Sequence, residues 1–237
     1  MNMSSFFSNE IFIVTFTFVA YFIAQKIQEK TGFILLNPIL IAVFIIITFL
    51  SVFKIDFATY HEGSKLISFF LKPAIVALGV PLYQQLEKIK KQAVPIIISQ
   101  LVGCIVGVVS VVLIAKLMGA SKEIIYSLAP KSVTTPIAIE VSKSIGGIPA
   151  LTAAVVIVVG IFGSIFGYGI MKLAKVKSSM AQGLAMGTAA HAVGTSKSME
   201  ISPAFGAMSS IGLIVNGIFT ALLTPYILQI MNIWISF

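Results

Sequence analysis

The chain has few charged residues and no arginine at all. Only 10% of its 237 residues are charged, whereas 58% are hydrophobic, and the mean hydropathy is +1.05. A soluble domain carries about 25% charged residues. The composition therefore excludes a soluble globular protein and indicates a polytopic membrane protein. The lack of arginine also removes the bidentate clamp that commonly holds phosphate groups.

Cysteine is nearly absent as well. The single Cys104 lies within an apolar run, which excludes a disulfide framework and a metal cluster held by cysteines. The first nine residues contain no Lys or Arg, which argues against a cleaved signal peptide and for a first spanning helix. The net charge of +8 comes from lysines that mostly occupy short loops. We read it as a signal of topology and anionic lipid contact, with no nucleic-acid partner.

Motifs for catalysis are also missing, so no enzymatic activity, catalytic residue, metal site or cofactor is expected. There is no H-E-x-x-H, no G-x-S-x-G and no pair of membrane aspartates. Ser132 follows Lys131, and Lys197 follows Ser196, which superficially suggests Ser–Lys nucleophilic catalysis. Neighbours in sequence rarely point at each other, and no other residue supports that chemistry.

Long apolar runs fill most of the chain. They predict an all-α polytopic integral membrane protein that forms a single domain over 1–237. About six full spans are expected, at 6–24, 33–53, 66–83, 93–115, 149–171 and 204–231. Two further segments, 123–145 and 180–201, are interrupted by Pro or Gly and carry polar groups, which predicts broken or re-entrant helices.

The basic segments at 25–30, 84–92 and 172–182 should all lie in the cytoplasm. This places the N-terminus outside, provided that 123–145 returns to the outer side as a re-entrant hairpin. The segment 180–201 would then enter from the cytoplasmic side, as in an inverted-repeat transporter. The alternative is that both segments cross fully and break the charge rule once. We favour opposed interrupted segments.

The two interrupted segments carry the candidate binding residues. Helix breaks expose backbone N–H groups at the positive end of a helix dipole, and with lysines and hydroxyls these suit a small carboxylate. His191 could couple proton movement, or it could make a structural hydrogen bond. The candidates for substrate binding are Lys131, Ser132, Thr134, Thr135, Thr188, His191, Gly194, Thr195 and Ser196; those for coupling or gating are His191, Lys197, Glu200 and Glu140.

The sequence also predicts ion pairs and helix faces made of small residues. Glu140 and Lys143, and Lys197 and Glu200, are three residues apart, so each pair shares a helical face. Two GxxxG spacings, at 103–107 and 163–167, permit close helix contact. They serve either internal packing or a protomer interface. We expect a homodimer, because a rocking carrier needs a fixed scaffold.

Several motifs together resemble the LrgB/CidB-like family of membrane proteins, over essentially the whole chain. They are 71–83, 130–138, 145–153, 183–195 and Glu200. The resemblance implies a multi-pass protein of the bacterial cytoplasmic membrane, often encoded beside a small holin-like partner of the LrgA/CidA type. Members have been described as modulators of murein hydrolase activity, and others as carriers of small carboxylates. Broken crossing helices, as in a distantly related transporter superfamily, are also implied.

The first expectation is therefore a carrier of small monocarboxylates such as pyruvate or glycolate, coupled to H⁺ or Na⁺. The alternative is an antiholin- or holin-associated regulator of murein hydrolase export or activity and of cell lysis. Saturable flux would favour the carrier, and nonselective leakage would favour a pore.

Overall fold

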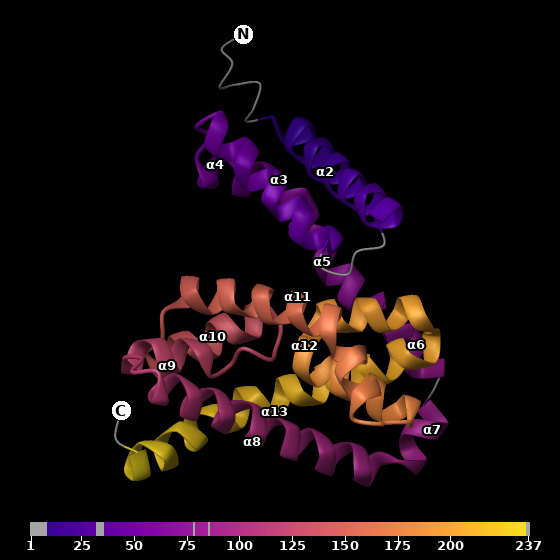
Figure 1. Cartoon of the computed structure of the whole chain (residues 1–237), viewed down its shortest axis with the longest axis vertical. Helices are drawn as coiled ribbons and strands as arrows, with labels where there is room; N and C mark the ends of the chain where they lie inside the picture. The colour runs from indigo at the N-terminus through magenta and orange to yellow at the C-terminus, as the bar shows by residue number, and fades with distance from the viewer. Residues whose placement is uncertain (1–8, 32–35, 78, 85, 236–237) are drawn as a thin grey trace. The chain divides into compact units, whose positions relative to one another are not determined.

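The computed structural model describes residues 9–31, 36–77, 79–84 and 86–235, and within these ranges it contains helices and no strands (Figure 1). The helices group into two compact units, residues 1–77 and 78–237, and the single domain predicted from the sequence stays a prediction. We describe each unit by itself.

The first unit contains α2 (Glu10–Thr31), α3 (Pro38–Val52), α4 (Phe57–Gly63) and α5 (Lys65–Ala77). Asn37 and Asp56 cap α3 and α4 by accepting backbone N–H groups, which fixes where these helices begin. The rings of Phe16 and Phe49 lie 4.3 Å apart between α2 and α3. A 2.9 Å hydrogen bond joins the hydroxyls of Thr17 and Tyr60.

Several predicted boundaries in this half of the chain were wrong. The basic stretch 25–30 is helical and forms the end of α2, and α4 lies between the spans predicted at 33–53 and 66–83. The span predicted at 33–53 is the 15-residue α3, and 33–35 lie outside the described residues. The span predicted at 66–83 is divided between α5 and α6 (Gly79–Gln84), with residue 78 not described. The predicted loop 84–92 contains α7 (Leu86–Lys91), and residue 85 is not described.

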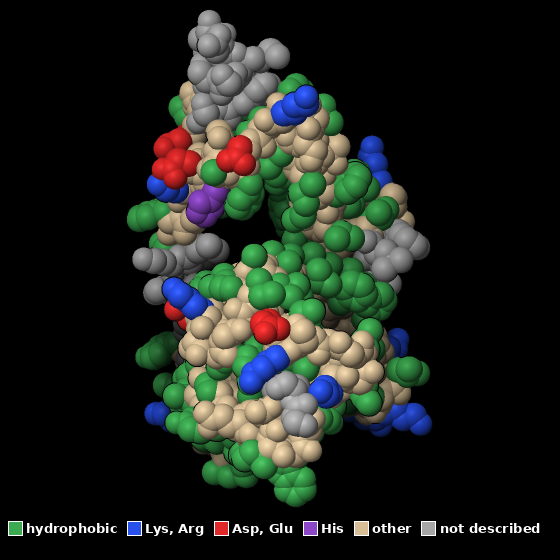
Figure 2. All heavy atoms as spheres, turned by 90° about the vertical axis from the view of Figure 1, so that its left-hand side faces the viewer, with side chains coloured by type: hydrophobic (Ala, Val, Ile, Leu, Met, Phe, Trp, Pro, Cys, Tyr) green, Lys and Arg blue, Asp and Glu red, His purple; other side chains and the backbone are tan. Residues whose placement is uncertain are grey.

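Three long helices frame the second unit: α8 (Ala93–Leu117), α11 (Pro149–Leu173) and α13 (Pro203–Ile235). Among the described residues, these three and α2 are the helices long and apolar enough to cross a membrane. Residues 6–8 of the first predicted span are not described. Apolar side chains cover much of the face seen in Figure 2, as expected of a protein whose surface contacts lipid.

The first interrupted segment folds back on itself. It consists of α9 (Lys122–Leu128), a non-helical tip at 129–134, and α10 (Thr135–Ile145). Thr152 hydrogen-bonds to the carbonyl of Ser127 at 2.9 Å and to the hydroxyl of Ser142 at 2.7 Å, so the end of α10 returns beside α9. Gly146, with φ at 89°, ends α10 in the left-handed conformation that glycine tolerates best.

The second interrupted segment, α12 (Ser179–Ile201), also reverses. Its backbone leaves helical geometry at His191, with φ at 41° and ψ at −135°. A Cβ on Gly194 would lie 2.7 Å from the carbonyl oxygen of Met186, eight residues earlier, which along a straight helix would be about 12 Å away. The arms 179–190 and 192–201 therefore lie side by side, and glycine at 194 permits their close contact.

The two hairpins enter the second unit from opposite ends. In Figure 1, α9 and α10 lie at the end where α8 finishes, and α12 lies at the end where α8 begins, beside α7. Two interrupted segments at opposite ends are what the charge pattern favoured, and their re-entrant course in a membrane stays a prediction. The basic segments 84–92 and 172–182 thus share one end of the unit.

Candidate functional site

The tips of the two hairpins meet at Asn216, on α13. Its side-chain amide donates to the carbonyl of Ser132, at the first tip, at 3.2 Å and to the carbonyl of Thr188, near the second tip, at 3.3 Å. Asn216 is only 1% exposed, and its amide oxygen has no partner among the described residues. One buried side chain therefore ties together two segments that the sequence predicted would converge.

Helix α8 packs against both tips through its GxxxG pair. A Cβ on Gly103 would lie 3.1 Å from the methyl group of Thr188, and one on Gly107 would lie 3.8 Å from the hydroxyl of Ser132. The second pair, Gly163 and Gly167 of α11, faces Ala190 and Met186 of α12. Both small-residue faces thus serve internal packing, and the predicted homodimer gains no support from them.

A cavity of about 500 Å³ opens beside the tips. Its polar lining comes from Lys131 and Ser132 at the first tip, Thr188 of α12, and Gln100 and Ser99 of α8. The ammonium group of Lys131 donates to the hydroxyl of Ser132 at 3.1 Å, and the hydroxyl of Thr188 donates to Gln100 at 2.5 Å. A cation and several hydroxyl or amide groups are therefore available to an anion.

A second cavity, of about 510 Å³, lies against α11. Its lining shares Lys131, Ala185 and Ala189 with the first cavity. The two hollows thus adjoin along the alanine face of the first α12 arm, and the side chain of Lys131 reaches both. Apart from Lys131, the residues that line this second cavity are apolar.

His191 holds the turn of the second hairpin. Its Nε2 atom lies 2.9 Å from the carbonyl oxygen of Val156 on α11, and the residue is 4% exposed. Thr195 bonds to the carbonyl of His191 and to the hydroxyl of Ser209 on α13, both at 3.0 Å. His191, Gly194 and Thr195 are buried and line neither cavity. This geometry favours the structural hydrogen bond for His191 over contact with a solute.

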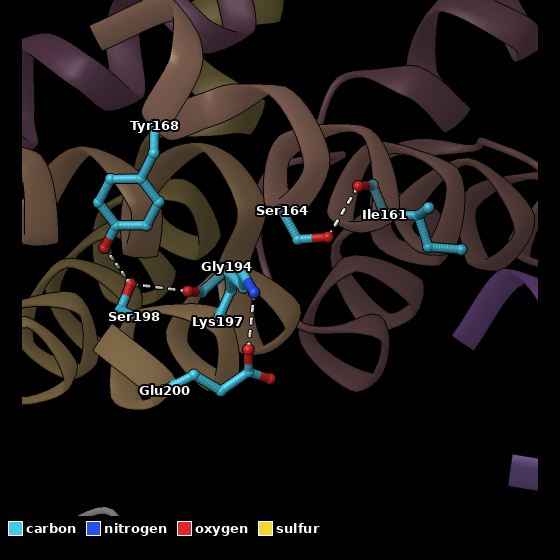
Figure 3. Close-up of polar contacts among 7 residues, drawn as sticks. All are labelled: Ile161, Ser164, Tyr168, Gly194, Lys197, Ser198 and Glu200. Carbon is cyan, nitrogen blue, oxygen red and sulfur yellow. Dashed lines mark hydrogen bonds and ion pairs between the residues drawn. The ribbon is translucent and has the colours of Figure 1, made fainter. Parts of the chain in front are cut away.

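The remaining candidates line neither of the two cavities. Thr134 and Thr135 are partly buried at the start of α10, and Ser196 is exposed. Lys197 and Glu200 form a 2.7 Å ion pair on the second arm, with side chains 45% and 62% exposed (Figure 3).

On α10, Glu140 is exposed, and within the described ranges it makes no ion pair with Lys143. Lys131, Ser132 and Thr188 thus line one cavity, and the other candidates line neither of the two.

A hydrogen-bond chain anchors the second arm near its base. The hydroxyl of Tyr168 on α11 donates to Ser198 at 2.9 Å, and Ser198 donates to the carbonyl of Gly194 at 2.7 Å (Figure 3). This chain holds the returning arm against α11 and thereby helps to fix the position of the tip.

Gln100 and Asn216 complete the site, although the sequence predicted them as contacts between helices and not as ligands. Each is a solitary polar residue in an apolar span, a pattern more typical of contacts between helices. The sequence signal for such a contact is the amide itself, because a buried amide costs free energy unless it hydrogen-bonds to a partner in the protein. No group of three potential metal ligands occurs in the described part of the chain.

Comparison with known proteins gives a consistent result. The model of the LrgB-like family matches residues 17–230. The holin-like protein CidB of Staphylococcus epidermidis is 38% identical over 92% of this chain and 95% of its own length. The antiholin-like protein LrgB of Bacillus mycoides is 38% identical over 90% of this chain and 94% of its own length. No solved structure matches.

The family match spans both units and both hairpins, and the apolar helices and bacterial relatives indicate a multi-pass bacterial membrane protein. This chain belongs to the LrgB-like family.

Proposed function

We propose that the chain is a membrane carrier that binds a small carboxylate, such as pyruvate or glycolate, beside the hairpin tips. The observation that carries this proposal is the cavity shared by Lys131, Ser132 and Thr188. One ammonium group with neighbouring hydroxyls suits a single carboxylate group, whereas a phosphate ester would favour the guanidinium forks that this chain lacks.

The rest of the cavity fits a short organic acid. Apolar groups of Val106, Leu184 and Ala185 form much of the lining, so a methyl or hydroxymethyl group beside the carboxylate would find a compatible wall. Burying a lysine in a membrane protein is costly unless it faces a cavity or an anion. Lys131 meets that requirement, because it lines two adjoining cavities.

Coupling to H⁺ or Na⁺ is part of the proposal. Glu140, whose side chain is exposed, is one candidate cation site, and Glu200 is a second that would have to exchange its ion pair with Lys197 for the cation. His191 is the alternative proton site, and its replacement by Ala would alter the pH profile of transport more than the apparent affinity. An unchanged pH profile would leave His191 with the role of holding the turn.

A second candidate function follows from the relatives. Proteins named holin-like CidB and antiholin-like LrgB favour a regulator of murein hydrolase export or activity and of cell lysis. Such a regulator would act in the bacterial cytoplasmic membrane with a small LrgA/CidA-type partner. The relatives' names favour this function over the carrier, whereas the cavity at Lys131 favours solute binding.

Proteoliposomes that contain this chain alone separate the two functions. The carrier requires saturable uptake of labelled pyruvate or glycolate that unlabelled acid competes away, with an entrapped dye retained. Dye leakage without saturable uptake would overturn the carrier. If neither is seen until the small partner is added, the regulator is supported. Cross-linking in the same liposomes tests the expected homodimer.

A further inference from the structure

A basic hollow of about 480 Å³ lies at the base of the α12 hairpin, apart from the cavities at the tips. Three lysines line it: Lys172 at the end of α11, and Lys175 and Lys177 in the connection to α12. The phenol ring of Tyr168 and the amide of Gln182 complete its polar wall. The proposed carrier has no use for these groups.

The hollow is held in shape by its own hydrogen bonds. Gln182 donates to the carbonyl of Val176 at 2.6 Å, which pins the connection to the first arm of the hairpin. The carbonyls of Ile170 and Met171, at the end of α11, accept the N–H groups of Ala174 and Val176. These terminal carbonyls are thus already satisfied, and the lysines are not required to cap the helix.

The charge of the hollow is uncompensated. None of its lining residues is acidic, and in the described ranges no carboxylate lies within 4.0 Å of Lys172, Lys175 or Lys177. The nearby Glu200 is paired with Lys197 instead. Three ammonium groups around one hollow repel each other, and a bound anion would relieve that repulsion.

Apolar groups adjoin the lysines. Ile201 and Phe205 line the hollow, and Leu173, beside Lys172, is 85% exposed. The site also lies where α11, a helix of membrane-spanning length, ends. A free anion would use only the lysines, whereas a lipid would place its headgroup among them and its acyl chains along the apolar flank.

We propose that this hollow binds the phosphate group of an anionic phospholipid. Basic pockets at the ends of spanning helices suit such headgroups, and lysines near an anionic membrane surface add to the attraction. Because Gln182 comes from the first arm of α12 and Ile201 from the end of the second, the bound lipid would hold the two arms together at their base.

The test compares lipid binding in two triple variants. In Lys172→Gln/Lys175→Gln/Lys177→Gln the hollow loses its charge. The control, Lys88→Gln/Lys90→Gln/Lys91→Gln, removes the same charge from α7 at the same end of the unit. Both are measured by thermal unfolding in detergent with added phosphatidylglycerol, phosphatidylcholine or inorganic phosphate.

Phosphatidylglycerol should raise the unfolding temperature of the unmodified chain and of the α7 control by several degrees, and that of the hollow variant by less than half as much. If the rise in unfolding temperature is reduced equally in both variants, the proposal is overturned, because an equal reduction indicates a general attraction to an anionic surface. An equal shift with inorganic phosphate alone would overturn the assignment to lipid.

Native mass spectrometry of the unmodified chain gives a second readout that does not depend on a variant folding. Retention of phosphatidylglycerol at least threefold above phosphatidylcholine would support the site. Equal retention of the two lipids would overturn it.

Discussion

Asn216 and Ser132 are 84 positions apart in the sequence, yet the amide of one donates a 3.2 Å hydrogen bond to the carbonyl of the other. The same amide also reaches the carbonyl of Thr188. This side chain is therefore the joint between the two hairpins, and its removal should affect both at once.

Replacing Asn216 by Leu keeps much of the volume and removes both hydrogen bonds. We expect the free energy of unfolding to fall by about 1–2 kcal/mol, since a hydrogen bond between membrane helices contributes roughly 0.6 kcal/mol and each freed carbonyl adds a cost. Chemical unfolding in detergent measures it. Thr224→Val is the control, because the buried Thr224 hydroxyl has no partner among the described residues and its loss should cost little. Equal stability of Asn216→Leu and the unmodified chain would contradict this role.

A methyl group at Gly160 should disturb the turn at His191. Its Cβ would lie 2.5 Å from Cε1 and 2.6 Å from Nε2 of the imidazole, so the ring must move from Val156. We expect Gly160→Ala to cost about 1–3 kcal/mol of stability in thermal unfolding, as overpacking commonly does. Gly169→Ala is matched to it on the same helix, since no atom lies within 4 Å of that position. The contact would be disproved if both substitutions had the same effect.

The charge of Lys131 should determine binding of a carboxylate. Lys131→Met retains the length of the side chain and removes the ammonium group, so we expect the kcat/KM of uptake to fall at least tenfold, about 1.4 kcal/mol. Uptake of labelled pyruvate or glycolate into proteoliposomes measures it. Lys143→Met, on α10 but outside both cavities, should transport normally. Normal uptake by Lys131→Met would remove the central residue of the proposed carrier.

The alanine face of α12 should limit the size of the solute. Ala189 lines both cavities, so Ala189→Leu would narrow each of them beside Lys131. We expect the initial rate of uptake to fall more for longer monocarboxylates than for the shortest acid. The measurement is the ratio of these two rates. Ala192→Leu provides the control, because Ala192 is exposed and lines neither cavity. An identical loss for every chain length would argue against a size filter at this position.

The helix breaks could be predicted from sequence because their causes are local. Pro130 follows the end of α9 and Pro136 occupies the first turn of α10, where proline is tolerated, and the polar residues between them would be costly in lipid. The basic segments then favoured opposed hairpins over two full crossings. The reversal at His191 was predicted only as a region, since a histidine with positive φ has no strong local signature.

Which residues form the site depends on contacts between distant segments, and a single sequence does not show these contacts. Thr195 and Ser132 are both hydroxyl residues near a break, but one bonds inward to Ser209 and the other lines the cavity. Gln100 and Asn216 enter the site through the approach of α8 and α13. The GxxxG spacing of Gly103 predicted close packing but could not say whether the neighbour was the same chain.

Within residues 93–235 both hairpins return to the end from which they enter, so α8, α11 and α13 are the helices that carry the chain from one end of the second unit to the other. If each of these helices crosses the membrane once, the single crossing by α13 puts the end of α13 in a different compartment from the lysines at 172–177. If those lysines face the cytoplasm, a fluorescent protein that matures only there would stay dark when fused after Ile235. The same reporter inserted at the connection between α11 and α12 would fluoresce.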